Sequence, residues 1–355
     1  MPISESNIRK VVPYVPGEQP QTDNKVKLNT NENPYPPAPG VIKAMRDISE
    51  DKLRLYPDPT MSGLVDALAE FYEVSPDQVF VGVGSDDVLA MCFLTFFNSG
   101  KPILFPNITY SFYKVWAELY KIPYRTPALA EDFRINPEDY RAENGGVIFP
   151  NPNAPTGRYE SLDVVEDMIR SNPDVPVIVD EAYIDFAEPG SSALPLLAKY
   201  DNLVVTRTFS KSRSMAGMRI GFAIASPYLI KCLNDVKYSF NSYTLNLPSI
   251  ICGIEAVRDK AYFERRLNEI KTTRNRAADE FRKLGFVFAD SSANFIFVRH
   301  PERSAKEIFD FLRARNVFVR YLGLEGAEEY LRVTIGTDEE MGCLFKWLRE
   351  FLQTE

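Results

Sequence analysis

The sequence predicts an α/β fold, in which a mostly parallel sheet is sandwiched by helices and a smaller α+β domain follows. Two observations predict it. Short apolar runs alternate with helical patterns through the first two thirds of the chain, and these runs are apolar on both faces. Strands of that kind are typical of parallel sheets that helices cover on each side. The length of 355 residues fits roughly two domains of ~150 residues each.

The elements of the larger part follow in order from these patterns. Residues 1 to about 40 are rich in Pro, Asn and Tyr and predict an irregular arm. An amphipathic helix is expected over 62–72, with Ser62 as its N-cap residue. Helices are also expected after residue 85 and from about residue 110. Strands are expected within 79–85, 101–106, 145–150, 175–180, 202–208 and 220–226.

A second, shorter alternation predicts the smaller domain. A long charged helix is expected over 257–283. It precedes strands at 295–298, 317–320 and 331–337 and helices at 304–315 and 338–352. We therefore expect three parts: an N-terminal arm over 1–45 that also contributes to the small domain, a large domain over 46–248 and a small C-terminal domain over 249–355.

Composition and charge argue against several classes of partner. The net charge of −8 disfavours nucleic acid or an anionic membrane, because both reward clustered Lys and Arg. The four cysteines show no paired spacing, which favours reduced thiols and a cytoplasmic location. The N-terminus lacks the apolar run of a signal peptide, and no stretch approaches the ~20 apolar residues of a membrane span.

The only histidine, His300, follows the apolar run FIFVR at an expected strand end. A structural or surface role is the simplest interpretation. With one histidine, a metal site built on two or three histidines is excluded, and we expect no metal. A Ser-His-Asp triad would have to use His300.

Candidate functional side chains follow one predicted strand directly. Lys211 comes just after the strand at 202–208, and Arg219 stands eight residues further on. Ligands of parallel sheets gather at the carboxyl ends of the strands, so a lysine there can project into the binding crevice. Thr208 and Ser210 could bind a phosphate dianion together with Arg219, which offers charge-assisted hydrogen bonds. Taken alone, this segment could equally be a solvated loop.

A carboxylate ends the neighbouring strand. Asp180 follows the apolar run VPVIV, and Tyr183 comes three residues later. A carboxylate in this place points into the crevice. Opposite a pyridine nitrogen it would keep that nitrogen protonated and strengthen the ring as an electron acceptor. The alternative is an ordinary helix N-cap.

Two further turns stand at predicted strand ends. Residues 151–157 read Asn-Pro-Asn-Ala-Pro-Thr-Gly, and two X-Pro bonds within four residues invite a cis peptide in a tight turn. The sequence Gly-Ser-Asp-Asp at 84–87 lies between a strand and a helix. A helix N-terminus offers free N–H groups to a phosphate, although the two acids could also be plain N-caps.

These motifs, in this order and spacing, resemble the aminotransferase class I/II family of fold-type I pyridoxal 5′-phosphate (PLP) enzymes. The resemblance covers almost the whole chain, and at finer level it points to the histidinol-phosphate aminotransferase branch. It implies a seven-stranded sheet in the large, PLP-binding domain. The segments that carry it are LNTNENPYPP (28–37), LRLYPDP (53–59), VGVGSDDVL (81–89), VDEAYIDF (179–186), TRTFSKSRSMAGMRIGF (206–222) and LRVTIGT (331–337).

The resemblance also implies roles for individual residues. Lys211 would carry PLP as a Schiff base and move the proton during catalysis, Asp180 would pair with the pyridinium nitrogen, and Tyr183 would bond the phenolic oxygen. Tyr110 would stack on the ring. The phosphate would be held by Ser85, Asp86, Thr208, Ser210 and Arg219. The family usually has Asn before Pro-Thr-Gly, where this chain has Ala154, so either Tyr183 acts without it or Asn153 reaches in.

Substrate and partner follow from the same resemblance. Tyr56 would reach the phosphate in the partner subunit's site, which implies a homodimer. Arg332 would grip the phosphate of histidinol phosphate and the carboxylate of glutamate, with Tyr14, Asn31 and Arg320 also in the substrate pocket. The implied reaction converts histidinol phosphate and 2-oxoglutarate into imidazole acetol phosphate and glutamate, in histidine biosynthesis.

Three alternatives share part of this pattern. Threonine-phosphate decarboxylases and aromatic amino-acid aminotransferases use the same motifs, and the tyrosines and Arg332 do not separate them. A PLP-sensing transcription regulator would need an added DNA-binding module of ~60–70 residues before the arm. The arm motif begins by residue 28, which disfavours such a regulator.

Overall fold

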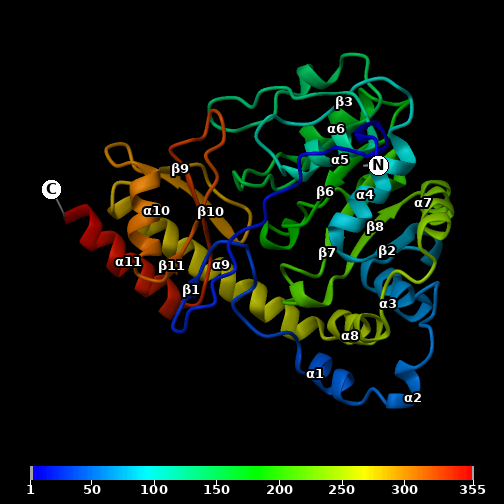
Figure 1. Ribbon diagram of the computed structural model, residues 1–355, viewed down its shortest axis with the longest axis horizontal. Coiled ribbons are helices and arrows are strands. Elements are labelled where there is room, and N and C mark those ends of the chain that lie inside the picture. Colours follow the sequence, from blue (N-terminus) through cyan, green and yellow to red (C-terminus); the bar gives the residue numbers. More distant parts are fainter. Residues whose placement is uncertain (1–2, 354–355) are drawn as a thin grey trace.

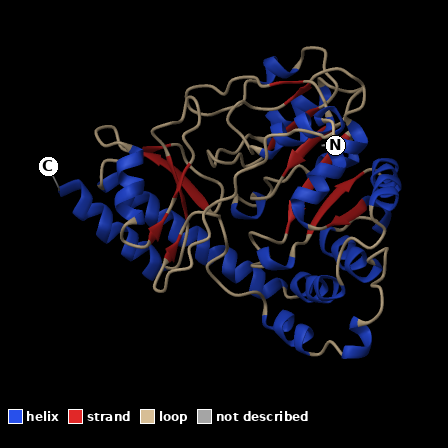
Figure 2. Ribbon diagram, in the orientation of Figure 1, coloured by secondary structure: helices blue, strands red, loops and turns tan. Residues whose placement is uncertain are grey.

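The computed structural model describes residues 3–353, in which a seven-stranded and a four-stranded sheet stand side by side and helices surround both (Figures 1 and 2). The larger sheet has seven strands in the order β2-β8-β7-β6-β5-β3-β4. Only β8 runs antiparallel to its neighbours, so the sheet is mostly parallel, as predicted. The strands are β2 (Val79–Gly82), β3 (Ile103–Leu104), β4 (Tyr124–Arg125), β5 (Val147–Pro150), β6 (Val177–Asp180), β7 (Leu203–Thr208) and β8 (Gly221–Ala225).

Burial on both faces explains why these runs form the sheet. All residues of β5, β6, β7 and β8 are buried. In β6, Ile178 packs on the side of α4 (Gly84–Phe96), α5 (Phe112–Tyr120) and α7 (Pro227–Phe240). Val177 and Val179 pack on the opposite side, against α6 (Leu162–Arg170). The alternation of side chains along a strand thus gives each helical layer its own apolar surface.

Three more helices lie beside β2 and β8. They are α1 (Pro39–Arg46), α3 (Ser62–Tyr72) and α8 (Leu247–Arg258), and they share one buried cluster with these strands. A short helix, α2 (Glu50–Leu53), connects α1 to α3. The predicted helix over 62–72 is confirmed, but Ser62 is not its N-cap. That position is Met61, and the Asp58 carboxylate accepts the Ser62 N–H instead (2.7 Å).

The smaller sheet is antiparallel, with the order β12-β13-β10-β9. Its strands are β9 (Val287–Phe288), β10 (Phe295–Arg299), β12 (Arg320–Tyr321) and β13 (Leu331–Thr334). Its helices are α9 (Lys260–Lys283), α10 (Ala305–Arg313) and α11 (Asp338–Gln353). The expected helix over 257–283 begins at Lys260, because Asp259 leaves the helical conformation and caps it by accepting the Tyr262 N–H.

The N-terminal arm belongs to both halves of the structure. Within it, β1 (Val26–Lys27) pairs with β11 (Val317–Phe318) in parallel, so the arm is not irregular throughout. The buried Leu28 then joins the core beneath the smaller sheet. The boundaries at 45 and 248 stay a prediction, and α8 packs on α1 and α3 beside the larger sheet. Among the described residues, no helix has both the length and the apolar character of a membrane span.

Candidate active site

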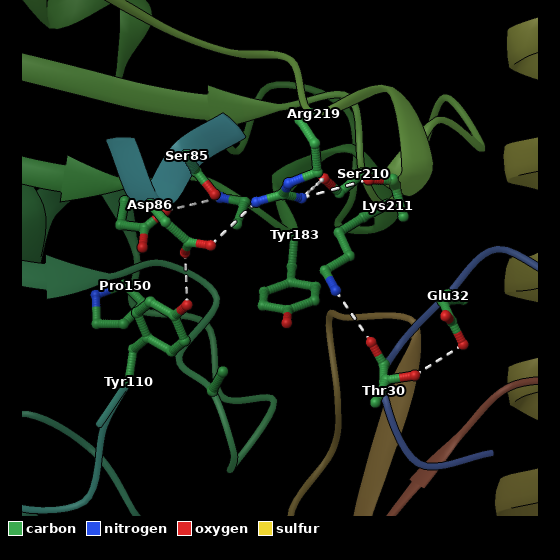
Figure 3. Close-up of a pocket in the computed structure, with 14 residues that line it drawn as sticks. Thr30, Glu32, Ser85, Asp86, Tyr110, Pro150, Tyr183, Ser210, Lys211 and Arg219 are labelled. Carbon is green, nitrogen blue, oxygen red and sulfur yellow. Dashed lines mark hydrogen bonds and ion pairs between the residues drawn. The ribbon is translucent and has the colours of Figure 1, made fainter. Parts of the chain in front are cut away.

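A pocket lies where β5, β6 and β7 end and α4 begins (Figure 3). Its lining combines a lysine, an arginine and two aspartates with hydroxyl groups. The carboxyl ends of parallel strands meet at one edge of a sheet, so residues far apart in the sequence converge there. Predicted residues that line it are Ser85, Asp86, Tyr110, Asp180, Tyr183, Ser210, Lys211 and Arg219.

Lys211 enters this pocket from the loop after β7. Its Nζ donates to the Thr30 carbonyl oxygen (3.1 Å) of the N-terminal arm. The amide of Asn33 holds the backbone behind it by donating to the Lys211 carbonyl (3.1 Å). Burial and the nearby positive charge of Arg332 lower the pKa of Lys211 to about 8, against the attraction of Glu32. A much larger fraction of this amine is therefore neutral at physiological pH than for an ordinary lysine.

Asp180 is the buried carboxylate at the end of β6. Tyr113 donates its hydroxyl proton to Oδ2 (2.9 Å), and the Ala182 N–H donates to Oδ1 (3.2 Å). Burial raises the pKa of Asp180 to about 6, while the hydrogen bond from Tyr113 acts in the opposite direction. The sequence analysis missed Tyr113. Its signal was the spacing of three residues from Tyr110, since the turn that leads into α5 brings the two rings to a centroid distance of 5.7 Å.

Arg219 and the start of α4 form another part of the pocket. The Arg219 guanidinium donates to the Asp86 carboxylate (3.1 Å) and to Ser210 Oγ (3.4 Å). The Tyr110 hydroxyl donates to the other oxygen of Asp86 (2.6 Å). Gly84 has φ +84°, and a Cβ there would lie 2.6 Å from Arg219, so only glycine lets the guanidinium lie against this helix end.

This set of groups fits PLP. The N–H groups at the start of a 13-residue helix, with Ser85, Ser210 and Arg219, suit a phosphate dianion. The buried Asp180 suits a protonated ring nitrogen, and a lysine with a lowered pKa suits an aldehyde. The cofactor chemistry inferred from the sequence thus has matching donors in one pocket.

Three predicted cofactor contacts lie outside this lining: Asn153, Thr208 and Tyr56. Asn153 directs its amide to Ile108 and Thr156, and its oxygen accepts from Thr109. Ala154 lines the pocket in its place. Thr208 is buried in its own turn, where its hydroxyl accepts from the Ser210 N–H (3.1 Å). Both Asn151–Pro152 and Ala154–Pro155 are cis, as the two X-Pro bonds suggested.

The predicted substrate residues lie around the arm. Arg332 donates to the Asn29 carbonyl (2.9 Å) and lies near enough to Lys211 to lower its pKa. Arg320 donates to the backbone of residues 15 and 16, and Tyr14 stacks on Phe112 with ring centroids 4.2 Å apart. The amide of Asn31 donates to the Tyr183 hydroxyl (3.0 Å).

Two other residues stand apart from the pocket. Tyr56 is 81% exposed and stacks on Tyr243 with centroids 4.5 Å apart. His300 accepts the Glu302 N–H through Nδ1 and packs edge-on against Phe286. A structural or surface role for His300 stays a prediction.

Comparison with known proteins identifies the family of this chain. The profile of the family "Aminotransferase class I and II" matches residues 23–346. The histidinol-phosphate aminotransferase 2 of Dechloromonas aromatica is 50% identical over 347 residues, 97% of each chain. The histidinol-phosphate aminotransferase 1 of Hydrogenovibrio crunogenus is 49% identical over 348 residues, 98% of this chain and 97% of that protein.

Solved structures show the same fold at lower identity. Histidinol-phosphate aminotransferase from Sinorhizobium meliloti, in complex with pyridoxal-5′-phosphate, has a TM-score of 0.85 at 24% identity, covering 92% of this chain and 91% of that one. The enzyme from Clostridium acetobutylicum has a TM-score of 0.86 at 22% identity, covering 93% and 99%. From the profile match and the relatives near 50% identity, the chain belongs to the aminotransferase class I and II family.

Proposed function

We propose that this chain is a PLP-dependent transaminase that converts histidinol phosphate and 2-oxoglutarate into imidazole acetol phosphate and glutamate. The observation that carries the proposal is the convergence of Lys211, Asp180 and Arg219 on one pocket. Relatives of nearly full length and close to half identity bear the name of this activity. The residues of the site support the choice of cofactor, and the names of the relatives support the choice of substrate.

When bound, PLP links to an amine through its aldehyde and accepts electrons from the carbon next to that amine. The chain's own residues do the rest. Lys211 Nζ takes the proton from that carbon, which its pKa of about 8 allows near neutral pH. Asp180 would hold a proton on the ring nitrogen, since a buried carboxylate favours a cationic partner. Arg219 fixes the phosphate.

The substrate end of the pocket is assigned to the cations around the arm. Arg332 and Arg320 come from neighbouring strands, β13 and β12, and the Arg320 charge lies close enough to help lower the pKa of Arg332, after burial as the main cause. Two guanidinium groups suit the phosphate of histidinol phosphate, and the same groups suit the second carboxylate of glutamate. Tyr14 is proposed to line the same end. Arg332 is the residue we expect to matter most, because it also affects Lys211.

A substrate panel tests the proposal. Purified holoenzyme is supplied with 2-oxoglutarate and one amine at a time: histidinol phosphate, phenylalanine, tyrosine or threonine phosphate. The highest kcat/KM for glutamate formation is expected with histidinol phosphate. Higher kcat/KM with an aromatic amino acid, or release of CO₂ from threonine phosphate without glutamate, would replace this function with one of the other two.

Replacing Arg219 with lysine is expected to weaken PLP binding to the apo form by roughly 10–100-fold, because a charge-assisted hydrogen bond is worth ~1.5–3 kcal/mol. Affinity for pyridoxal, which has no phosphate, should change little. Equilibrium titration of apo-protein with each ligand measures both. Arg170→Lys is the matched control, since Arg170 is 70% exposed and pairs with Asp167 at the end of α6. Equal losses for PLP and pyridoxal would remove Arg219 from the phosphate site.

We also propose a homodimer in which Tyr56 reaches the partner's phosphate site. Exposed apolar side chains precede it in the sequence: Leu53 is 59% exposed and Leu55 is 58% exposed. Large exposed apolar clusters mark interaction surfaces.

All four cysteines are free thiols, which suits the reducing cytoplasm that we propose as the location of this protein.

Mixing two inactive variants tests the Tyr56 assignment. Tyr56→Ala and Lys211→Ala homodimers should each have little activity, since every site in them carries one defect. After unfolding and refolding together, a mixed dimer has one site with both defects and one with neither. Activity should rise to about one quarter of wild type, because half of the dimers are mixed. A mixture no more active than its components would place Tyr56 outside the partner's site.

A further inference from the structure

Three successive arm residues, Asn29, Thr30 and Asn31, contact the proposed catalytic groups. Asn29 accepts from Arg332, Thr30 accepts from Lys211, and Asn31 donates to Tyr183. Asn31 is 1% exposed and has φ +56°, a conformation that Asn tolerates better than most residues. A buried residue held in that conformation is placed by its surroundings.

The surroundings of Asn31 fix which way its amide points. The Thr334 hydroxyl oxygen accepts the Asn31 backbone N–H (3.0 Å) and its proton is directed at Asn31 Oδ1 (3.0 Å). Thr334 is 2% exposed, and among residues 3–353 its proton has Asn31 Oδ1 as its one acceptor. The reversed amide would leave that proton without an acceptor, at a cost of ~1–3 kcal/mol. Nδ2 therefore faces Tyr183.

The amide orientation decides what Tyr183 can do. Its hydroxyl oxygen accepts from Asn31 Nδ2 (3.0 Å), so its own proton must go to another partner. Tyr183 lines the pocket and lies between Tyr110 and Lys211 (Figure 3). Burial raises the pKa of Tyr183, so the hydroxyl keeps its proton at neutral pH. Ala154, which also lines the pocket, contributes no polar side chain.

We propose that Asn31 and Thr334 are positioning residues that make the Tyr183 hydroxyl a hydrogen-bond donor to an oxygen of the ligand in this pocket. This assigns Asn31 to the cofactor side of the pocket instead of the substrate side. The inference rests on the proposed cofactor site, with the phenolic oxygen of PLP as the acceptor. It is independent of which amine is the substrate.

Asn31→Asp tests the proposal with the least change in shape. A carboxylate accepts only, so it would draw the Tyr183 proton away from the pocket, and Asp also tolerates a positive φ. Apo-protein is titrated with PLP and with its 3-deoxy analogue, which lacks the phenolic oxygen. We expect PLP affinity to fall about tenfold or more, since one hydrogen bond to a charged oxygen is lost. Affinity for the analogue should stay within about twofold of wild type.

Thr334 supplies a matched pair of variants. Thr334→Ser keeps the hydroxyl and should bind PLP like wild type, whereas Thr334→Val should show a smaller version of the Asn31→Asp loss. In a Tyr183→Phe background, neither Asn31→Asp nor Thr334→Val should lower PLP affinity further, because the hydroxyl that they orient is absent. Equal losses for PLP and the analogue would reduce Asn31 to a structural role, and no loss for either would refute the proposal. A different substrate preference would leave this comparison unchanged.

Discussion

Lys211→Ala is expected to abolish stable attachment of PLP and to lower turnover by about 10²–10⁴-fold or more, the range for losing a positioned acid–base group. Lys211 supplies both the attachment point and the proton acceptor in the proposed reaction. Its Nζ is the amine that lines the pocket, beside Thr30 and under the influence of Arg332. Turnover close to wild type in this variant would contradict the central assignment.

Chemical trapping locates the attachment independently of activity. Borohydride reduction of the holoenzyme, followed by peptide mass spectrometry, should place the cofactor on Lys211. Lys237 is the matched control, since it is also buried and burial lowers its pKa to about 8 as well. It belongs to α7 and contacts Phe80 and Tyr238 instead of the pocket. Lys237→Met should keep the label on Lys211, and a label on Lys237 would refute the assignment.

The lowered pKa of Lys211 gives the attachment a pH dependence with a definite sign. Below pH 8 the amine is mostly protonated and has no lone pair for the aldehyde, and above pH 8 it is mostly neutral. The rate of attachment to apo-protein should therefore rise with pH and reach half of its plateau near pH 8. An unperturbed lysine would give a midpoint near ~10.4. Stopped-flow absorbance over pH 6–10 distinguishes the two.

The sequence was sufficient to place the groups that stand at strand ends. Asp180 is the last residue of β6, and Lys211 follows β7. Because these two strands are parallel neighbours, their carboxyl ends lie together regardless of how the side chains pack. The same reasoning placed Ser85 at the start of α4. These positions depend on where strands end and helices begin, which the hydrophobic pattern predicts.

Contacts between side chains of distant segments could not be predicted in this way. The bond from Asn31 to Tyr183 spans 152 positions, and that from Tyr113 to Asp180 spans 67. Each depends on how the arm or a helix packs over the pocket, which no local pattern records. Asn153 is a residue that was predicted to contact the cofactor but does not line the pocket. Its amide instead donates to the Ile108 carbonyl and accepts from the Thr109 hydroxyl.

Asp180→Ala should leave PLP attached to Lys211 but lower turnover by about 10²–10³-fold, the cost of removing a preorganised electrostatic contact to a charge that the reaction needs. The attachment uses the aldehyde, which Asp180 is not expected to contact. Proton removal from the substrate, by contrast, depends on a cationic ring. Absorbance of the bound cofactor and steady-state kcat separate the two effects. A fall in turnover of less than ~10-fold, about 1.4 kcal/mol, would show that Asp180 does not hold the ring nitrogen's proton.

Tyr113→Phe is the graded form of the same test. It removes one donor from the Asp180 carboxylate and leaves the aromatic packing beside Phe93 and Trp116 in place. A donor to a charged group is worth ~1.5–3 kcal/mol, or roughly one to two pH units. The pKa of Asp180, about 6 in the unliganded site, should rise by that amount, because the lost bond favoured the ionised form. The carboxylate is charged above its pKa, so PLP affinity of the apo form should begin to fall at a pH that is higher by one to two units. An unchanged acidic limb would mean that Asp180 is held ionised by the Ala182 N–H and Thr206 alone, and that Tyr113 serves the core and not the site.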